Sequence, residues 1–304
     1  MNKKRRFAFM LCASLLTVAL GGWYLAHTNI PVLEPTGSIG TRERNLIVFA
    51  LLLSLIVVIP VFTMAIAFAW RYRESNQTAA YRPDFTHSRL LETAWWAIPG
   101  LLILILSIVT WNSTHSLDPY KSISASTNPL VVDVVALDWK WLFIYPAQHV
   151  ASVNLLVLPI NTPIRFNITA DAPMNSFWIP QLGGQIYAMP GMSTQLHLEA
   201  SKVGDYYGSS ANISGSGFAG MTFTARVASA TDFMMWLQAA TRAQHALTMA
   251  VYDALAQPSK NNPAVEYSSV DPGLYSAILA KYMSPSPAPG TMNYQTSGMQ
   301  GMGM

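Results

Sequence analysis

The chain has 304 residues, of which 51% are hydrophobic and only 11% are charged, whereas about 25% of the residues in a typical soluble domain are charged. Its formal net charge of +3 is too small for the electrostatic footprint of a nucleic-acid-binding protein, so we expect no nucleic-acid partner. The single cysteine, Cys12, excludes an internal disulfide and any metal site that needs two thiolates from one chain.

The first apolar segment, residues 7–26, follows a run of basic residues at 3–6. A basic region before an apolar one is typical of a secretory signal, and Ala19 and Gly21 offer a cleavage site after position 21 or 22. An uncleaved signal anchor is the alternative, since the segment is just long enough to span a bilayer. We therefore predict a signal sequence or a signal anchor over residues 1–26.

Two further uncharged segments predict a helical hairpin in the membrane. Residues 46–70 carry no charge and would form a helix of roughly 38 Å, enough to cross a hydrocarbon core of about 30 Å. Residues 93–111 are also uncharged and have tryptophans at both ends, where aromatic belts lie in membrane helices. Pro60 and Pro99 predict packing kinks. The sequence thus predicts a transmembrane hairpin over residues 46–111.

The loop between the two spans sets the expected orientation. Residues 71–89 hold four arginines against two acidic side chains, and the N-terminal run is strongly basic. The positive-inside rule therefore places both on the cytoplasmic side. Everything after the second span would then form an exported domain.

The first part of the exported region has the pattern of an all-β domain. Residues 129–228 are rich in Val, Ile, Thr and aromatic side chains, and Ile164, Phe166 and Ile168 alternate with polar neighbours. Short strands without intervening helices favour a Greek-key sandwich or barrel. The predicted strands are residues 131–137, 139–145, 153–158, 164–169, 195–198 and 221–227.

The sequence becomes helical after this domain. Thr231 could cap a helix over residues 232–249, and shorter helical stretches follow at 251–255 and 272–283. Residues 231–283 are therefore predicted as a C-terminal helical region. The tail, residues 284–304, consists largely of Pro, Ser, Gly and Met and is predicted to be disordered.

Three motifs of the exported part carry a resemblance to a known family. They are D-W-K-W at 138–141, N-S-F-W-I-P-Q-L-G-G-Q-I-Y-A-M-P-G-M at 175–192 and Y-G-S-S-A-N-I-S-G-S-G-F-A-G-M at 207–221. With the hairpin before them, they resemble subunit II of the haem–copper terminal oxidases, and the last two resemble its quinol-oxidising branch. The resemblance implies a membrane protein in which a two-helix transmembrane hairpin precedes an all-β, cupredoxin-like Greek-key barrel and a short helical C-terminal region.

The resemblance also identifies where a copper centre would lie. In the cytochrome c-oxidising branch, two bridging thiolates, two imidazoles, a thioether and a backbone carbonyl hold two copper ions, as soft metals require. The aligned residues of this sequence are Asn175 and Phe218 for the histidines, Ser210 and Ser214 for the cysteines, Asn212 for the carbonyl donor, and Met221 for the methionine. Because serine cannot replace a bridging thiolate and phenylalanine supplies no donor, we expect a degenerate copper site without metal.

The function that the resemblance implies is that of a supporting subunit in a respiratory ubiquinol oxidase, which couples ubiquinol oxidation and oxygen reduction to water with proton translocation. Subunit I would hold the haems and copper, and this chain no cofactor. Ubiquinol dissolves in the bilayer, so electrons need no exported copper domain. The expected partners are subunit I, further subunits, the lipid bilayer and ubiquinol, but not cytochrome c.

The expected location is the bacterial inner membrane, with the large C-terminal domain in the periplasm. The alternative function is a membrane-tethered periplasmic scaffold or a copper-handling protein that uses the methionines of the tail. A cytochrome c oxidase subunit is disfavoured because the copper ligands are missing.

Two further residues are singled out by the resemblance. Glu92, at the start of the second span, matches a glutamate at the mouth of a proton-uptake pathway into subunit I, and it is the candidate catalytic residue. A solvated carboxylate that favours the helix N-terminus is the alternative. Trp139 matches a residue at the surface where copper-bearing relatives receive electrons. Without copper behind it, we expect Trp139 to serve packing.

Overall fold

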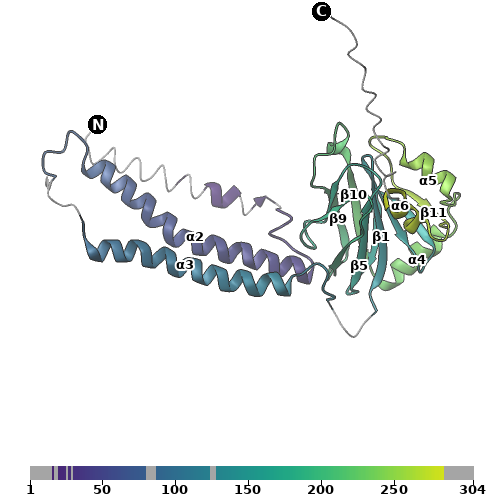
Figure 1. Ribbon diagram of the computed structural model, residues 1–304, viewed down its shortest axis with the longest axis horizontal. Coiled ribbons are helices and arrows are strands. Elements are labelled where there is room, and N and C mark those ends of the chain that lie inside the picture. Colours follow the sequence, from purple (N-terminus) through teal and green to yellow (C-terminus); the bar gives the residue numbers. More distant parts are fainter. Residues whose placement is uncertain are drawn as a thin grey trace, which may run out of the picture.

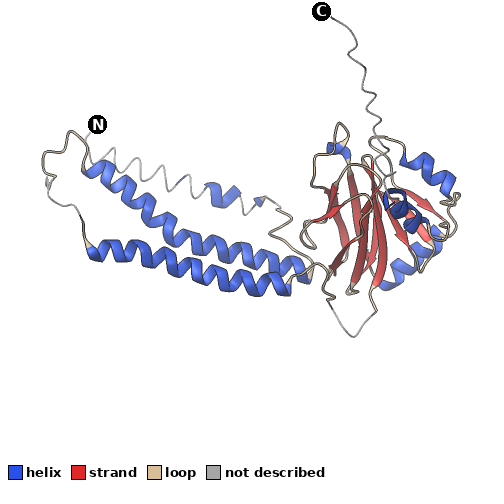
Figure 2. Ribbon diagram, in the orientation of Figure 1, coloured by secondary structure: helices blue, strands red, loops and turns tan. Residues whose placement is uncertain are grey.

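The computed structural model describes residues 16, 20–24, 27, 28, 30–79, 87–123 and 128–283. Two long helices lead into a β-sandwich, and short helices lie against one side of the sandwich (Figures 1 and 2). The predicted signal segment lies largely outside the described residues, and the predicted disordered tail lies wholly outside them.

The hairpin consists of α2 (Ser38–Arg71) and α3 (Arg89–Ser116). Both helices are longer than the uncharged segments that predicted them, because each continues into polar residues at both ends. The most apolar 18-residue stretch has a mean hydropathy of 3.0 in α2 and 1.9 in α3, and none of the residues in either stretch is buried within the chain. A helix of a soluble domain would bury an apolar stripe, so these two are membrane helices, as predicted.

The part of the chain after the hairpin is a two-layer β-sandwich. Among the described residues, the six-stranded sheet has the order β11-β3-β2-β1-β5-β8 and the five-stranded sheet the order β4-β10-β9-β6-β7. The strands are β1 (Leu130–Leu137), β2 (Lys140–Tyr145), β3 (Val150–Val153), β4 (Leu155–Pro159), β5 (Ile164–Ala170), β6 (Asn175–Trp178), β7 (Ile186–Ala188), β8 (Thr194–Leu198), β9 (Gly204–Ser210), β10 (Thr222–Ala228) and β11 (Val265–Tyr267).

Parallel pairing of β1 with β5 and of β4 with β10 is combined with antiparallel pairing elsewhere. The chain crosses between the layers after β3, β4, β5, β7, β8 and β10, as in a cupredoxin-like Greek-key domain, and the predicted all-β fold is confirmed. The layers meet in an aromatic core in which the Trp141 ring lies 5.5 Å from Phe177 and 5.8 Å from Phe223.

The predicted strand over residues 153–158 is wrong, because it is two strands in different sheets. Asn154 separates β3 from β4 with φ of 54°, a left-handed conformation that asparagine adopts more readily than most residues. Its side-chain oxygen accepts a hydrogen bond from the Trp141 amide at 2.9 Å. Asn154 therefore turns the chain from one layer to the other.

The predicted helix over residues 232–249 is also wrong. Two short helices occupy this region, α4 (Ala230–Ala240) and α5 (Met249–Ala256), and each has its own cap. The cap of α4 is Ser229 rather than Thr231, since its hydroxyl accepts a hydrogen bond from the Asp232 amide at 3.1 Å. Thr248 caps α5 in the same way.

The helical C-terminal region forms a second core against the six-stranded sheet. α6 (Leu274–Met283) follows β11, and its Leu274 and Ile278 are buried together with Tyr252 of α5. These side chains pack against Leu142 and other apolar residues of β1, β2 and β3 on the outer face of the sheet. The sandwich is thus covered on this face by the C-terminal region (Figure 1).

The residues just before and at the start of α2 tie the hairpin to the sandwich. The Thr36 amide donates to the Gln181 carbonyl at 2.8 Å, and the Gly40 amide donates to the Leu182 carbonyl at 2.9 Å. The Gly184 amide donates to Glu43 Oε1 at 3.1 Å. A Cβ at Gly40 would lie 3.1 Å from the Leu182 carbonyl oxygen, so this close approach favours glycine.

Candidate functional site

The residues aligned with copper ligands lie on β6, at the end of β9 and in the segment before β10. Asn175 begins β6 and Ser210 ends β9, and their exposed fractions are 1% and 5%. The two strands pair antiparallel, with Phe177 opposite Ser210. This pairing brings together residues that are far apart in the sequence, and Ser210 Oγ donates to Asn175 Oδ1 at 2.9 Å.

Further hydrogen bonds link this pair to Asn212. The Asn212 amide lies 3.4 Å from Ser210 Oγ, and Ser176 Oγ donates to Asn212 Oδ1 at 3.1 Å. The side-chain amide of Asn175 donates to the Pro173 carbonyl at 2.7 Å. Buried polar groups need such partners, and here hydroxyl and amide groups of the chain supply them to one another.

The side chains of the other three aligned residues do not belong to this hydrogen-bonded cluster. Ser214 Oγ is buried without a hydrogen-bond partner in the part of the chain that the structure describes. Phe218 begins the 3₁₀ turn η1 (Phe218–Gly220) and is half-buried, and Met221 is buried in the core. Within the described residues, no group of three or more His, Cys, Asp or Glu side chains is placed to hold a metal ion.

Trp139 covers the segment that carries Ser214. It lies in the turn between β1 and β2 with φ of 61°, and its Nε1 donates to the Ser214 carbonyl at 3.3 Å. A Cβ at Gly217 would lie 2.2 Å from the Trp139 ring, so only glycine permits this contact. Lys260 Nζ lies 5.4 Å from the ring centroid, within the range of a cation–π interaction. Trp139 thus packs against the core and holds the segment in place.

Glu92 lies in the first turn of α3, at the end of the hairpin that is remote from the sandwich. Its backbone amide donates to the carbonyl of the N-cap residue Ser88 at 2.9 Å, and its side chain is exposed. Glu92 is therefore remote from the sandwich that carries the cluster around Ser210.

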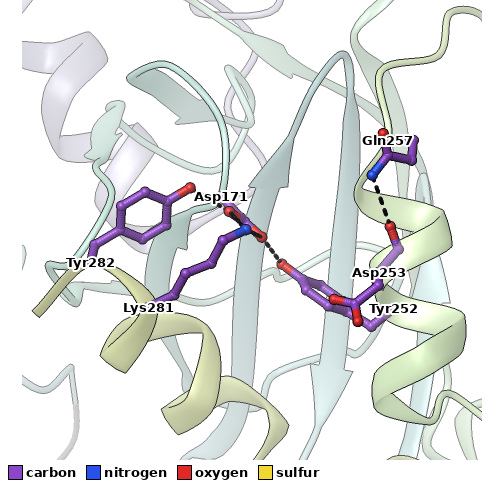
Figure 3. Close-up of polar contacts among 6 residues, drawn as sticks. All are labelled: Asp171, Tyr252, Asp253, Gln257, Lys281 and Tyr282. Atoms are coloured by element: carbon purple, nitrogen blue, oxygen red, sulfur yellow. Dashed lines mark hydrogen bonds and ion pairs between the residues drawn. The ribbon is translucent and has the colours of Figure 1, made fainter. Parts of the chain in front are cut away.

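A buried carboxylate that sequence reasoning missed links the C-terminal region to the sandwich. Asp171 follows β5, and its side chain is 2% exposed. Figure 3 shows three donors from the C-terminal helices around it. Lys281 Nζ lies 2.7 Å from Asp171 Oδ1, Tyr252 OH lies 2.7 Å from Oδ2, and Tyr282 OH donates to Oδ1.

These contacts decide the ionisation of Asp171. Burial alone would raise the pKa of the carboxyl, but the hydrogen bonds from Lys281, Tyr282 and Tyr252 and the charge of Lys281 hold its pKa below the ordinary value. The carboxylate is thus ionised in the folded state and fixes α5 and α6 against the sheet. An acidic residue directly after an apolar strand was the only sequence signal.

Comparisons with known proteins assign the family. Residues 125–228 match the family model of the cytochrome c oxidase subunit II periplasmic domain, and residues 242–286 match that of the COX aromatic-rich motif. The second match covers α5 and α6, which carry the donors to Asp171.

Three relatives match most of the chain. Cytochrome bo(3) ubiquinol oxidase subunit 2 of Pseudomonas putida is 50% identical over 86% of this chain and 84% of its own length. The protein of the same name from Pseudomonas aeruginosa is 45% identical over 99% and 89%. Ubiquinol oxidase subunit 2 of Acetobacter aceti is 49% identical over 85% and 84%. This chain therefore belongs to the ubiquinol oxidase subunit II family, within the cytochrome c oxidase subunit II superfamily.

Proposed function

We propose that this chain is a supporting subunit of a respiratory ubiquinol oxidase and that it binds no copper. The observation that carries the proposal is the cluster of Asn175, Ser210 and Asn212, whose side chains and amides hydrogen-bond to one another at positions aligned with copper ligands. The only cysteine of the sequence, Cys12, lies far from this cluster in the chain. A dinuclear thiolate-bridged centre needs two thiolates, which this domain does not have.

Electrons would reach the complex from the lipid phase. The relatives named above are ubiquinol oxidase subunits, and ubiquinol dissolves in the bilayer. Subunit I would then hold the quinol site, the haems and the oxygen-reducing copper, and cytochrome c would not be a donor. This subunit would cover the outer face of subunit I with its sandwich and pack its two helices against it.

Orientation follows from the charge of the loop between α2 and α3. Its excess of arginines favours the cytoplasmic side of a bacterial inner membrane. The sandwich would then lie in the periplasm. Glu92 would face the cytoplasm at the start of α3 and would serve proton uptake into subunit I. Ionisable side chains at such positions often belong to proton pathways.

Oxygen uptake by the purified complex tests this function. A ubiquinol analogue should sustain oxygen uptake, whereas reduced cytochrome c should not, and copper analysis of the separated subunits should find copper in subunit I alone. Stoichiometric copper in this subunit, or respiration driven by cytochrome c, would contradict the proposal. A chain that purifies alone and carries Cu(I) would favour the copper-handling alternative.

A further inference from the structure

A polar cleft of about 450 Å³ opens where the hairpin joins the sandwich. Its walls come from the first turns of α2, from residues 116–123 at and after the end of α3, and from residues 184, 185, 196 and 197 of the sandwich. One wall is the buried His197, whose Nδ1 lies 3.0 Å from the Pro119 carbonyl. The cleft is therefore built by three separate parts of the fold.

The cleft combines both signs of charge. Arg42 and Lys121 contribute two cations to its lining, and Glu43 and Asp118 contribute two carboxylates. Glu43 is held in place by the hydrogen bond from the Gly184 amide. A ligand that complements this lining carries an anionic and a cationic group close together.

An apolar groove continues from the cleft along the seam between the two helices. Its volume is about 300 Å³, and Leu46 and Phe49 of α2 face Leu106 and Val109 of α3 across it. Leu117 lines both the cleft and the groove. The polar and apolar spaces therefore meet at the end of α3.

Helix geometry places the two spaces in line. Glu43, Leu46 and Ala50 are three and four residues apart and so lie on one face of α2. Glu43 lines the cleft, and Leu46 and Ala50 line the groove. From Glu43 to Ala50 the helix rises about 10 Å. The seam thus passes from charged to apolar side chains along one direction.

The position of the seam relative to the membrane matches this change. The strongly apolar part of α2 begins at residue 46 and that of α3 ends at residue 111. The cleft therefore lies at the level of the headgroups, and the groove begins at the membrane boundary and extends into the hydrocarbon. A molecule that fills both must be amphipathic and must have its polar part at the sandwich end.

We propose that this seam binds a zwitterionic phospholipid with a primary amine headgroup, from the leaflet on the side of the sandwich. The phosphate lies by Arg42 and Lys121, the ammonium group lies by Glu43 and Asp118, and one acyl chain lies in the groove. The site does not depend on whether the sandwich binds copper. It gives the junction between membrane and sandwich a lipid as a third structural component.

Photo-crosslinking in the intact complex tests the site. The complex is reconstituted in phosphatidylcholine vesicles that contain a phosphatidylethanolamine probe with a diazirine on one acyl chain. Peptides covering residues 42–50 and 106–121 should be labelled. Unlabelled phosphatidylethanolamine should compete, and phosphatidylglycerol and inorganic phosphate should compete much less. Equal competition by phosphatidylglycerol or by phosphate would overturn the proposal.

Two sets of variants test the headgroup site and the acyl-chain groove separately. The double variant Arg42→Ala with Lys121→Ala should reduce labelling about tenfold, because each cation near the membrane surface favours a phosphate. Arg44→Ala is the control, since Arg44 bonds to Asn45 and lies outside the cleft lining.

Ala50→Leu fills the groove and should also reduce labelling. Ala65→Leu, farther along α2 and outside the groove lining, should not. The haem spectrum reports whether each variant assembles. If the double variant does not assemble, the labelling of Ala50→Leu decides the test. Unchanged labelling in Ala50→Leu, or a crosslink showing that a segment of another subunit fills the cleft, would overturn the proposal.

Discussion

Replacing Tyr252 by phenylalanine removes one of the donors that hold the buried carboxylate of Asp171. The lost hydrogen bond is 2.7 Å long, and both the residue Tyr252 and the side chain of Asp171 are only 2% exposed. A hydrogen bond to a charged group contributes about 1.5–3 kcal/mol. Because Tyr252 and Asp171 belong to different parts of the fold, this free energy opposes separation of the C-terminal region from the sheet. The equilibrium constant for separating the C-terminal region from the sheet should therefore rise about 10- to 150-fold.

Amide hydrogen exchange in the purified complex measures this opening, since exchange reports local unfolding free energies. Faster exchange is expected in α5 and α6 and not in the strands of the five-stranded sheet. Tyr267→Phe is the matched control: Tyr267 lies in the same core, but its hydroxyl has no hydrogen bond within the described residues. An increase in exchange for Tyr252→Phe no larger than for Tyr267→Phe would refute the reasoning.

Three further outcomes are expected. Ser210→Ala should speed exchange in β6 by an amount equivalent to about 1–3 kcal/mol, because Asn175 loses its buried donor, whereas Ser209→Ala should have little effect. Since folding lowers the pKa of Asp171, its stabilisation is complete above the ordinary value of 3.8 and is lost as the pH falls below it. Protection of α6 should therefore fall in acid, and the Asp171→Asn variant should lack this pH dependence. Glu92→Gln should slow quinol-driven turnover severalfold, and Glu74→Gln, in the loop between α2 and α3, should not; equal turnover in both would exclude Glu92 from proton uptake.

The membrane helices and the longer strands were predictable because their apolar side chains follow simple patterns. Length and the absence of charge identified α2 and α3, and the Val- and Ile-rich segments identified β1, β2 and β5. β9 was missed because it contains glycines and polar residues. A Cβ at Gly208 would lie 2.2 Å from the Phe223 ring, so this glycine is required by packing against another strand. Such a requirement is not visible in local sequence.

The candidate site was predictable only as a set of aligned positions. The resemblance named Asn175 and Ser210, but their hydrogen bond depends on the pairing of β6 with β9. The contact of Asp171 with Lys281 joins residues 110 positions apart. The helix predicted over 232–249 failed because helical composition alone did not reveal that Ser229 and Thr248 cap two separate helices. Contacts between residues far apart in the chain, and the choice between alternative helix caps, could therefore not be predicted from the sequence.

The hydrogen bonds from Thr36 and Gly40 to residues 181 and 182 fix the angle of α2 about its own axis. An α-helix turns by about 100° for each residue. One residue inserted between Glu43 and Leu46 would swing the remainder of α2 through that angle and redirect each of its sides. Backbone hydrogen bonds between the start of α2 and the sandwich thus determine which side of the membrane helix faces in which direction.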